Sequence, residues 1–189
     1  QDRFAGTVMR HLGPSLPDRP DNALSLVIHP DDQMLLHSLQ HHEDAATALS
    51  QYFGISIQQF NTARQIMHGC FGEDLDDLGV LDFACGYGRL LRLLKLFIPP
   101  AHLRAAEIQP GALDFVRQNF GVQGILSSAD PQAFDSDERF DFIWVASLFS
   151  HLPDRLFHAW LGKLSALLTQ RGVLCFSARS SELLPAGET

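Results

Sequence analysis

The chain has 189 residues, of which 46% are apolar and 19% charged, with a formal net charge of −8. This length suits one domain with a substantial core, and the composition is that of a globular protein rather than a disordered one. The acidic balance argues against a protein that neutralises many phosphates, so we expect no nucleic-acid partner.

The sequence also limits the compartment and the metal chemistry. No stretch approaches the roughly 20 apolar residues that span a bilayer, and the N-terminus lacks a signal-peptide core, so we expect no membrane partner. The three cysteines are widely spaced, odd in number and without metal-ligand spacing. These features predict a reducing, cytoplasmic setting with no disulfide and no metal site.

The first 78 residues divide into two segments. Residues 1–30 contain four prolines and predict an extended or partly ordered arm, in which the apolar residues 24–28 form a short strand or a strap along the body. Residues 31–78 predict a helical lid segment, with one helix after Asp32, a second that stops at Gly54, and a third that begins at a capping box on Ser56.

The rest of the chain is organised around residues 79–95, GVLDFACGYGRLLRLLK. A short apolar run of strand length ends in Asp82, a Gly-x-Gly turn follows, and apolar residues then recur at helical spacing. Glycines let the backbone turn sharply, and the start of a helix offers N–H donors to an anionic group. We interpret Arg89, Arg92 and Lys95 as a solvated face of this helix.

Four further apolar runs, at residues 102–108, 124–127, 140–146 and 173–177, predict strands. Helical patterns separate them, with one helix opening at Pro110 and another presenting an inner face from Leu156 to Leu168. The residues Arg171 and Gly172 predict a turn before the last strand. Strands that alternate with helices predict a parallel sheet with right-handed crossovers.

The glycine loop distinguishes between two kinds of ligand. A dinucleotide fingerprint needs a third glycine where this chain has Leu91, and a carboxylate at Asp82 would repel a pyrophosphate. The sequence from Asp82 to Gly88, DFACGYG, instead resembles the first motif of the class I S-adenosylmethionine (SAM)-dependent methyltransferases, acidic-x-Gly-x-Gly-x-Gly. Ala84 stands in place of the first glycine. Because alanine rarely adopts a positive φ angle, this replacement puts a positive φ at that position in doubt.

The resemblance extends over residues 79–178 and includes Glu107, about 20 positions after the loop, as a ribose-binding carboxylate. It implies an α/β fold with a doubly wound, mainly parallel sheet of strand order 3-2-1-4-5. Residues 79–189 would form the Rossmann-like, SAM-binding core. The family's closing antiparallel hairpin would follow Ser177 and is expected to be missing. Either the sequence is truncated or the last strand is covered by other means, including a homodimer through that edge.

The resemblance also implies where SAM lies. Asp82 and the loop backbone would hold its methionine part, Glu107 would accept both ribose hydroxyls, and Ile108 would lie against the adenine. Asp130 would accept from the adenine amine, or else cap an ordinary turn. The predicted cofactor-binding residues are Asp82, Ala84, Cys85, Gly86, Gly88, Glu107, Ile108, Ala129, Asp130, Ala146 and Ser147.

The predicted reaction is methyl transfer from SAM to a small-molecule acceptor. A bound sulfonium needs mainly alignment and exclusion of water, and a base only if the acceptor must lose a proton. His151 is the candidate base, or a structural histidine at the strand exit, and Tyr52 and Phe53 are the candidates for closing the lid.

Three alternatives stay open. An NAD-linked oxidoreductase would use Glu107 but leaves Asp82 unexplained. A cysteine hydrolase built on Cys85 lacks the glycines of a nucleophile elbow, because those positions are Phe83 and Tyr87. A non-catalytic SAM-binding module is of a different class and would use the same loop.

Overall fold

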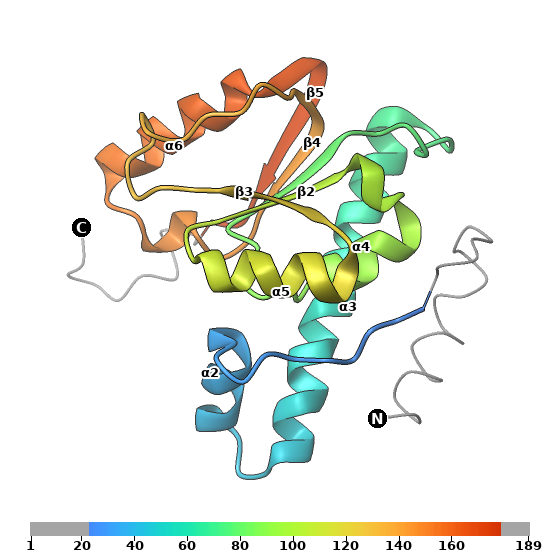
Figure 1. Cartoon of the computed structure of the whole chain (residues 1–189), viewed down its shortest axis with the longest axis vertical. Helices are drawn as coiled ribbons and strands as arrows, with labels where there is room; N and C mark the ends of the chain where they lie inside the picture. Colours follow the sequence, from blue (N-terminus) through green and yellow to red (C-terminus); the bar gives the residue numbers. More distant parts are fainter. Residues whose placement is uncertain (1–22, 179–189) are drawn as a thin grey trace.

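The computed structural model describes residues 23–178 (Figure 1). The helices are α2 (Gln33–His41), α3 (Ala45–Phe71), α4 (Leu91–Phe97), α5 (Pro110–Phe120) and α6 (Asp154–Ala166). The strands are β1 (Val80–Phe83), β2 (Leu103–Glu107), β3 (Gln123–Leu126), β4 (Phe140–Val145) and β5 (Leu168–Phe176). Two short 3-10 turns are η2 (Pro100–His102) and η3 (Phe149–His151). Most of the predicted arm and the end of the predicted core lie outside the described residues.

The five strands form one sheet in the order β3-β2-β1-β4-β5, and every neighbouring pair is parallel. This confirms the predicted doubly wound fold and its strand order. The order reverses between β1 and β4, and ligands of such sheets bind at the carboxyl ends of the strands near this reversal. The register there places Asp82 of β1 beside Trp144 of β4.

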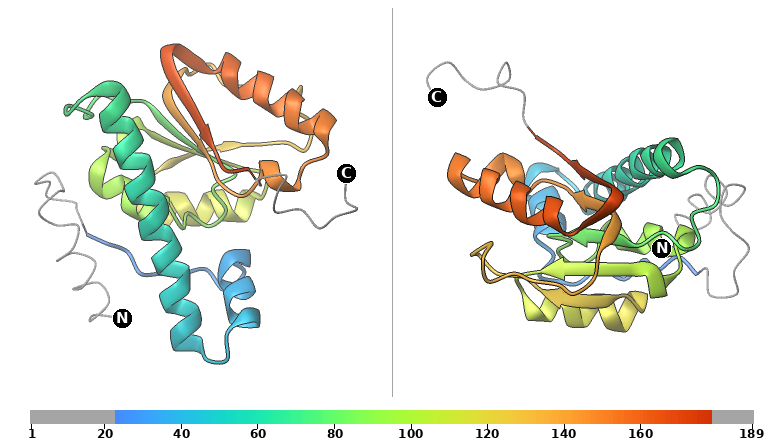
Figure 2. Two further views of the ribbon diagram at one scale, coloured as in Figure 1. Left: turned by 180° about the vertical axis from the view of Figure 1, so that it is seen from behind. Right: turned by 90° about the horizontal axis from the view of Figure 1, so that it is seen from above.

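Helices cover both faces of the sheet, because successive strand residues point to opposite sides. Phe142 and Trp144 pack with α3, α4 and α5, whereas Ile143 and Val145 pack with α6. A strand buried on both faces needs an almost continuous apolar sequence, which is what β4 has. Seen from behind, α3 passes beside the sheet and its N-terminal half extends beyond the sheet to α2 (Figure 2).

Helix α3 is a single helix of 27 residues, so the predicted stop at Gly54 and restart at Ser56 are wrong. Gly54 costs an isolated helix about 1 kcal/mol relative to alanine. The packing of the buried residues Tyr52, Phe53 and Phe60 on both sides of it outweighs that cost. Ser56 does not cap a helix, because its hydroxyl donates to the carbonyl oxygen of Arg89.

Residues 23–32 form the strap, an extended segment without strand pairing that runs beneath α5 to α2 (Figure 1). Of the two forms expected for residues 24–28, the structure therefore has the strap. The predicted solvated face of α4 is wrong for Arg92, whose side chain is 0% exposed. Its guanidinium donates to backbone oxygens of the strap, and these bonds offset the cost of burying a charge.

Strand β5 starts earlier than predicted, at Leu168, which belongs to the strand and not to the preceding helix. The expected turn at Arg171 and Gly172 is also wrong, because both residues lie within β5 near a shift in its register with β4. Gly172 is needed there, since a Cβ atom would lie 2.7 Å from the carbonyl oxygen of Phe140.

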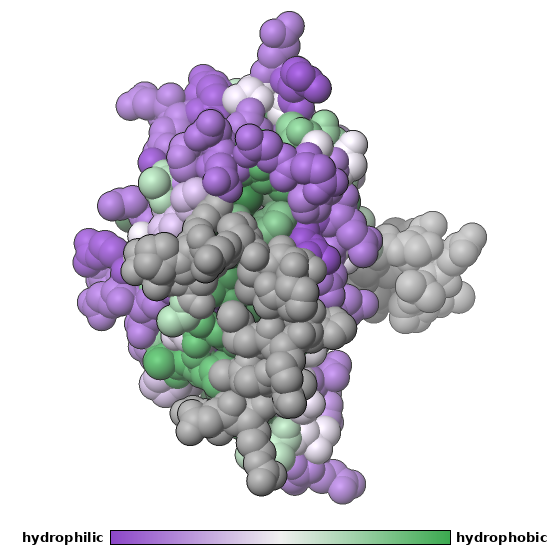
Figure 3. Space-filling model, turned by 90° about the vertical axis from the view of Figure 1, so that its right-hand side faces the viewer, coloured by the Kyte–Doolittle hydropathy of each residue, from purple (hydrophilic) through white to green (hydrophobic). Residues whose placement is uncertain are grey.

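The surface is mixed in character. On the side shown in Figure 3, the coloured surface is hydrophilic around its edges, and apolar surface lies towards its middle. Among residues 23–178, no helix is both long and apolar enough to cross a bilayer.

Candidate functional site

A cavity of about 230 Å³ lies at the carboxyl ends of β1, β2 and β4, at the reversal of strand order. It brings together seven of the predicted site residues, which are Asp82, Ala84, Cys85, Gly86, Glu107, Ala146 and Ser147. The crevice expected at this edge of the sheet is therefore present, and the glycine loop forms part of its wall.

The loop between β1 and α4 takes up backbone angles that favour glycine at three positions. Ala84, Gly86 and Gly88 have φ angles of 58°, 55° and 76°. Ala84 therefore adopts the positive φ that its replacement of glycine had put in question.

The two glycines of the loop are needed for different reasons. A Cβ atom on Gly86 would meet no atom within 4 Å, so its backbone is open to a ligand. A Cβ atom on Gly88 would lie 2.5 Å from the Phe120 ring, so this glycine permits α5 to pack on the loop. Gly88 does not line the cavity.

Asp82 has an unusual environment for a carboxyl group. It is only 3% exposed, and its Oδ2 atom has no hydrogen-bond partner among the described residues. Burial raises the pKa of Asp82 to about 8, with Glu107 adding to the increase and Arg89 opposing it. An unpaired carboxyl group in a cavity favours a cationic ligand group.

Trp144 presents the complementary feature next to Asp82. Its side chain lines the cavity, is 7% exposed, and its Nε1 donor also lacks a partner among residues 23–178. Buried polar atoms are nearly always hydrogen-bonded in folded proteins. One acceptor and one donor, from paired positions of β1 and β4, are therefore buried without a partner beside the cavity.

Glu107 ends β2 and is tied to the backbone on both sides. Its Oε2 atom accepts from the Gly86 amide at 2.9 Å, and its Oε1 atom accepts from the amides of Ile108 at 2.8 Å and Gln109 at 3.2 Å. A carboxylate has about four acceptor positions, so these bonds leave one for a ligand donor. They also fix the orientation of the carboxylate against the glycine loop.

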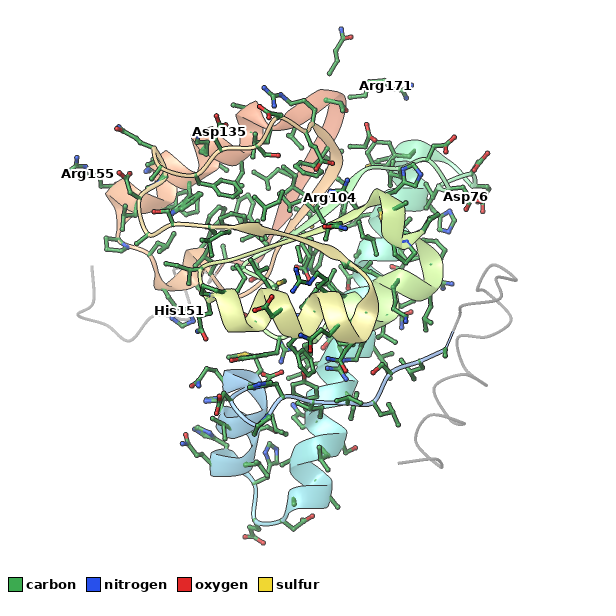
Figure 4. All side chains as sticks on the ribbon, in the orientation of Figure 1. Asp76, Arg104, Asp135, His151, Arg155 and Arg171 are labelled. Carbon is green, nitrogen blue, oxygen red and sulfur yellow. The ribbon has the colours of Figure 1, made fainter. Side chains whose placement is uncertain are left out.

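Five predicted site residues do not line the cavity, namely Gly88, Ile108, Ala129, Asp130 and His151. Ile108 is 50% exposed, immediately after Glu107. Asp130 accepts from the Gln132 amide, as in the alternative interpretation of a turn cap. His151 lies in η3 at the outer surface (Figure 4), whereas the labelled Arg171 and Asp76 lie near the opposite ends of the strands.

Sequence reasoning missed several residues of the cavity wall. Leu90, Gln109, Ala112 and Trp144 lie within four positions of predicted site residues, and the strand and loop spacing could have indicated them. Asp32, Gln33, Met34 and Gln59 come from the strap, α2 and α3. No local pattern marks these four, because only the packing of the N-terminal helices brings them to the cavity.

The two lid candidates are not at the cavity surface. Tyr52 and Phe53 are 1% and 8% exposed and do not line the cavity. Tyr52 instead donates from its hydroxyl to Asp32 Oδ2 at 2.7 Å, and Asp32 does line it.

Comparison with known proteins identifies the domain. Residues 80–172 match a family model described as a methyltransferase domain. Residues 80–172 therefore form a methyltransferase domain. Over 108 residues it is 30% identical to the malonyl-[acyl-carrier protein] O-methyltransferase of Acetivibrio thermocellus. That match covers 55% of this chain and 38% of the relative, so the chain spans well under half the length of that protein.

Solved structures share the fold of this methyltransferase domain. The sugar N-methyltransferase KedS8 from a Streptoalloteichus species matches with a TM-score of 0.60 at 15% identity, over 90% of this chain and 64% of that one. DesVI from Streptomyces venezuelae matches with a TM-score of 0.55 at 17% identity, over 85% and 62% of the two chains. At these identities the likeness concerns the fold alone.

The chemistry of the methyltransferase loop argues against a nucleophilic cysteine. Cys85 is half-buried, and its pKa is raised well above the usual value by burial and by the nearby Asp82 and Glu107. A nucleophilic cysteine needs a lowered pKa, because the thiolate is the reactive form. Among residues 23–178, no group of three or more His, Cys, Asp or Glu side chains is arranged to hold a metal ion.

Proposed function

We propose that this domain binds SAM in the cavity and catalyses transfer of its methyl group to a small-molecule acceptor. The observation that carries the proposal is the placement of two buried carboxyl groups, Asp82 and Glu107, on neighbouring strands with the open backbone of Gly86 between them. SAM supplies an activated methyl group when bound.

The charges around the cavity suit an amino-acid group that carries both signs. Asp82 has an unpartnered acceptor for an ammonium group, and Arg89 is the only Lys or Arg among the described residues that line the cavity. We assign the ammonium of SAM to Asp82, its carboxylate to the side of Arg89, and one further hydrogen bond to Trp144 Nε1.

We assign the ribose to Glu107. The carboxylate lies where the second-strand acid of the family is expected, and its three backbone bonds leave room for one ribose hydroxyl. A second ribose bond would need the Gly86 or Gln109 amide to move away. Ile108 remains the proposed adenine neighbour, with Ala129 and Asp130 beyond it.

The residues of the chain have modest chemical tasks in this reaction. The cavity walls align the acceptor with the methyl group and exclude water, which are the main requirements of a displacement at a methyl carbon. His151 remains the proposed base for an acceptor that must lose a proton, although it lies at the outer surface. Ala146 and Ser147, at the exit of β4, would border the reacting groups.

The acceptor class rests on the relatives. KedS8 is named a sugar N-methyltransferase, and CalS10 from Micromonospora echinaspora an amino pentose methyltransferase, with a TM-score of 0.54 at 19% identity. These names and the acidic composition support a small-molecule acceptor, and the three widely spaced cysteines support a cytoplasmic setting. We also propose a homodimer that forms through the edge strand β5.

Titration calorimetry with S-adenosylhomocysteine (SAH), SAM and NAD tests the proposal. We expect binding of SAH and SAM and no binding of NAD. NAD binding without SAM binding would establish the oxidoreductase alternative instead. SAM binding without turnover across sugar, amine and carboxylate acceptors would favour the non-catalytic module.

A further inference from the structure

A buried cluster of polar groups joins the strap to the helices beside the cavity. Arg92 of α4 lies at its centre and is 0% exposed. Its Nη1 atom donates to the carbonyl oxygens of Ser25 and Val27, at 3.2 Å each, and its Nη2 atom donates to the Tyr52 hydroxyl at 3.2 Å. Its Nε atom has no hydrogen-bond partner among the described residues, and Arg92 does not line the cavity, so its burial calls for another explanation.

The cluster continues from Arg92 to the cavity wall. The Tyr52 hydroxyl, which accepts from Arg92, donates to Asp32 Oδ2. Asp32 Oδ1 accepts from the Met34 amide and caps α2. Asp32 and Met34 both line the cavity. The position of this wall is therefore coupled through two hydrogen bonds to a residue buried in α4.

A second contact fastens the strap to the glycine loop itself. The His29 ring stacks on the Tyr87 ring with centroids 4.3 Å apart and planes 9° from parallel. Tyr87 lies in the loop and lines the cavity. The strap is thus held at three places, at Ser25 and Val27 by Arg92, at His29 by Tyr87, and at Asp32 by Tyr52.

All of these contacts are made within the protein and none needs a ligand. We propose that Arg92 and Tyr52 are positioning residues that fix the strap before any ligand arrives, so that Asp32, Gln33 and Met34 form a preformed wall of the cavity. The strap is then part of the binding site at rest and is not a lid that folds over the ligand. Preorganisation of this kind avoids an ordering cost on binding. The inference does not depend on which ligand the cavity holds.

Hydrogen exchange of the unliganded full chain tests the inference. The reporters are the Asp32, Met34 and Leu36 amides, which donate to His29, Asp32 Oδ1 and Asp32 respectively. In Tyr52→Phe the ring stays and the hydroxyl is lost. We expect exchange of these amides to become roughly 10- to 100-fold faster, the factor for losing one hydrogen bond to a charged group.

Thr169→Val is a matched control. It also removes one hydroxyl that donates to a carboxylate, here Asp141 Oδ1 at 2.8 Å, but it lies in β5. It should leave the three amides unchanged. His29→Ala removes the ring contacts of His29 with Tyr87 and Phe115 and the hydrogen bond from the Asp31 amide to His29 Nδ1. It should also speed exchange of the three amides, and it replaces Tyr52→Phe as the test if that variant does not fold.

The thiols give a second readout within one molecule. Cys85 lines the cavity, whereas Cys70 is exposed at the end of α3. Maleimide labelling followed by peptide mapping should be several-fold faster at Cys85 in Tyr52→Phe and unchanged at Cys70. The inference would be overturned if the wild-type amides at 32–36 became protected from exchange only when SAH is added. It would also be overturned if Cys85 were labelled at the same rate in Tyr52→Phe and Thr169→Val.

Discussion

Asp82 Oδ2 and Trp144 Nε1, from paired positions on β1 and β4, are both buried and both lack a hydrogen-bond partner among residues 23–178. A protein that leaves an acceptor and a donor unpaired side by side incurs a desolvation cost for each atom. A ligand that pairs with them recovers this cost, so the pair favours the liganded state.

Binding of SAH should be coupled to release of a proton from Asp82. The pKa of Asp82 is about 8, so its carboxyl group is mostly protonated at pH 7. A ligand ammonium group would favour the ionised form. Affinity should therefore rise with pH, by at most about tenfold per unit, until pH 8 and then level off. Calorimetry in buffers of different ionisation enthalpy measures the released proton. A dissociation constant that stays flat between pH 6 and 8 would contradict this assignment.

Asp82 should also make the unliganded fold less stable at high pH. Its pKa is raised from the ordinary 3.8 to about 8, so the folded state holds the proton more tightly than the unfolded state does. Stability attributable to this group therefore falls as the pH rises from about 4 to 8. The melting temperature of Asp82→Asn, measured relative to that of the wild type, should rise as the pH increases over this range. Asp137→Asn, at an exposed position, should show no such trend.

Alanine at the two glycines of the loop should destabilise the fold to different extents and affect binding differently. Gly88→Ala meets the Phe120 ring and should lose about 2–4 kcal/mol, from left-handed strain and overpacking together. Gly86→Ala meets no atom and should lose only the strain, about 1–2 kcal/mol, but its methyl group would enter the cavity. Urea unfolding and SAH titration of both variants measure the two effects. Equal losses of stability would show that Phe120 yields to the added methyl group.

Removal of the Glu107 carboxylate should weaken SAH binding by roughly 1.5–3 kcal/mol, the value of hydrogen bonds to a charged group. Glu107→Ala also releases the Gly86, Ile108 and Gln109 amides. Glu107→Gln keeps the shape and one acceptor oxygen, which can still accept from the Ile108 and Gln109 amides, but its NH2 group cannot accept from Gly86, so urea unfolding of both variants is needed to separate binding from loop stability. Glu43→Ala is the control, because Glu43 is exposed and outside the cavity. Unchanged SAH affinity in both Glu107 variants would mean that the ribose lies elsewhere.

Local patterns in the sequence predicted the parts of the fold that local physics determines. The β4 strand is apolar because both of its faces are buried, and its run of apolar residues is plain in the sequence itself. The order of strands followed from the resemblance and from the alternation of strands and helices. Asp82, Glu107 and Gly86 were found because residues at strand ends follow directly from the strand positions.

Contacts between distant segments account for the failures. Gly54 has the local signal of a helix end, but packing of its neighbours carries α3 through it. Arg92 sits in a basic pattern typical of a solvated face, but the strap supplies its hydrogen bonds from more than 60 residues away. Asp32 lines the cavity and accepts a hydrogen bond from Tyr52, 20 residues away. Periodicity within one segment has no access to such partners.

The left-handed conformation of Ala84 has a consequence for how the motif is read. Glycine at this position would relieve strain of about 1–2 kcal/mol, but it would lose a partly buried methyl group worth less than about 0.8 kcal/mol and add freedom to the unfolded chain. The exchange is close to neutral, and the loop is held by other bonds, such as the Cys85 amide to the Ala106 carbonyl at 3.1 Å. Ala84 therefore keeps the backbone conformation that glycine usually supplies at this position. A search that counts only glycines would miss chains with the same loop conformation and this substitution.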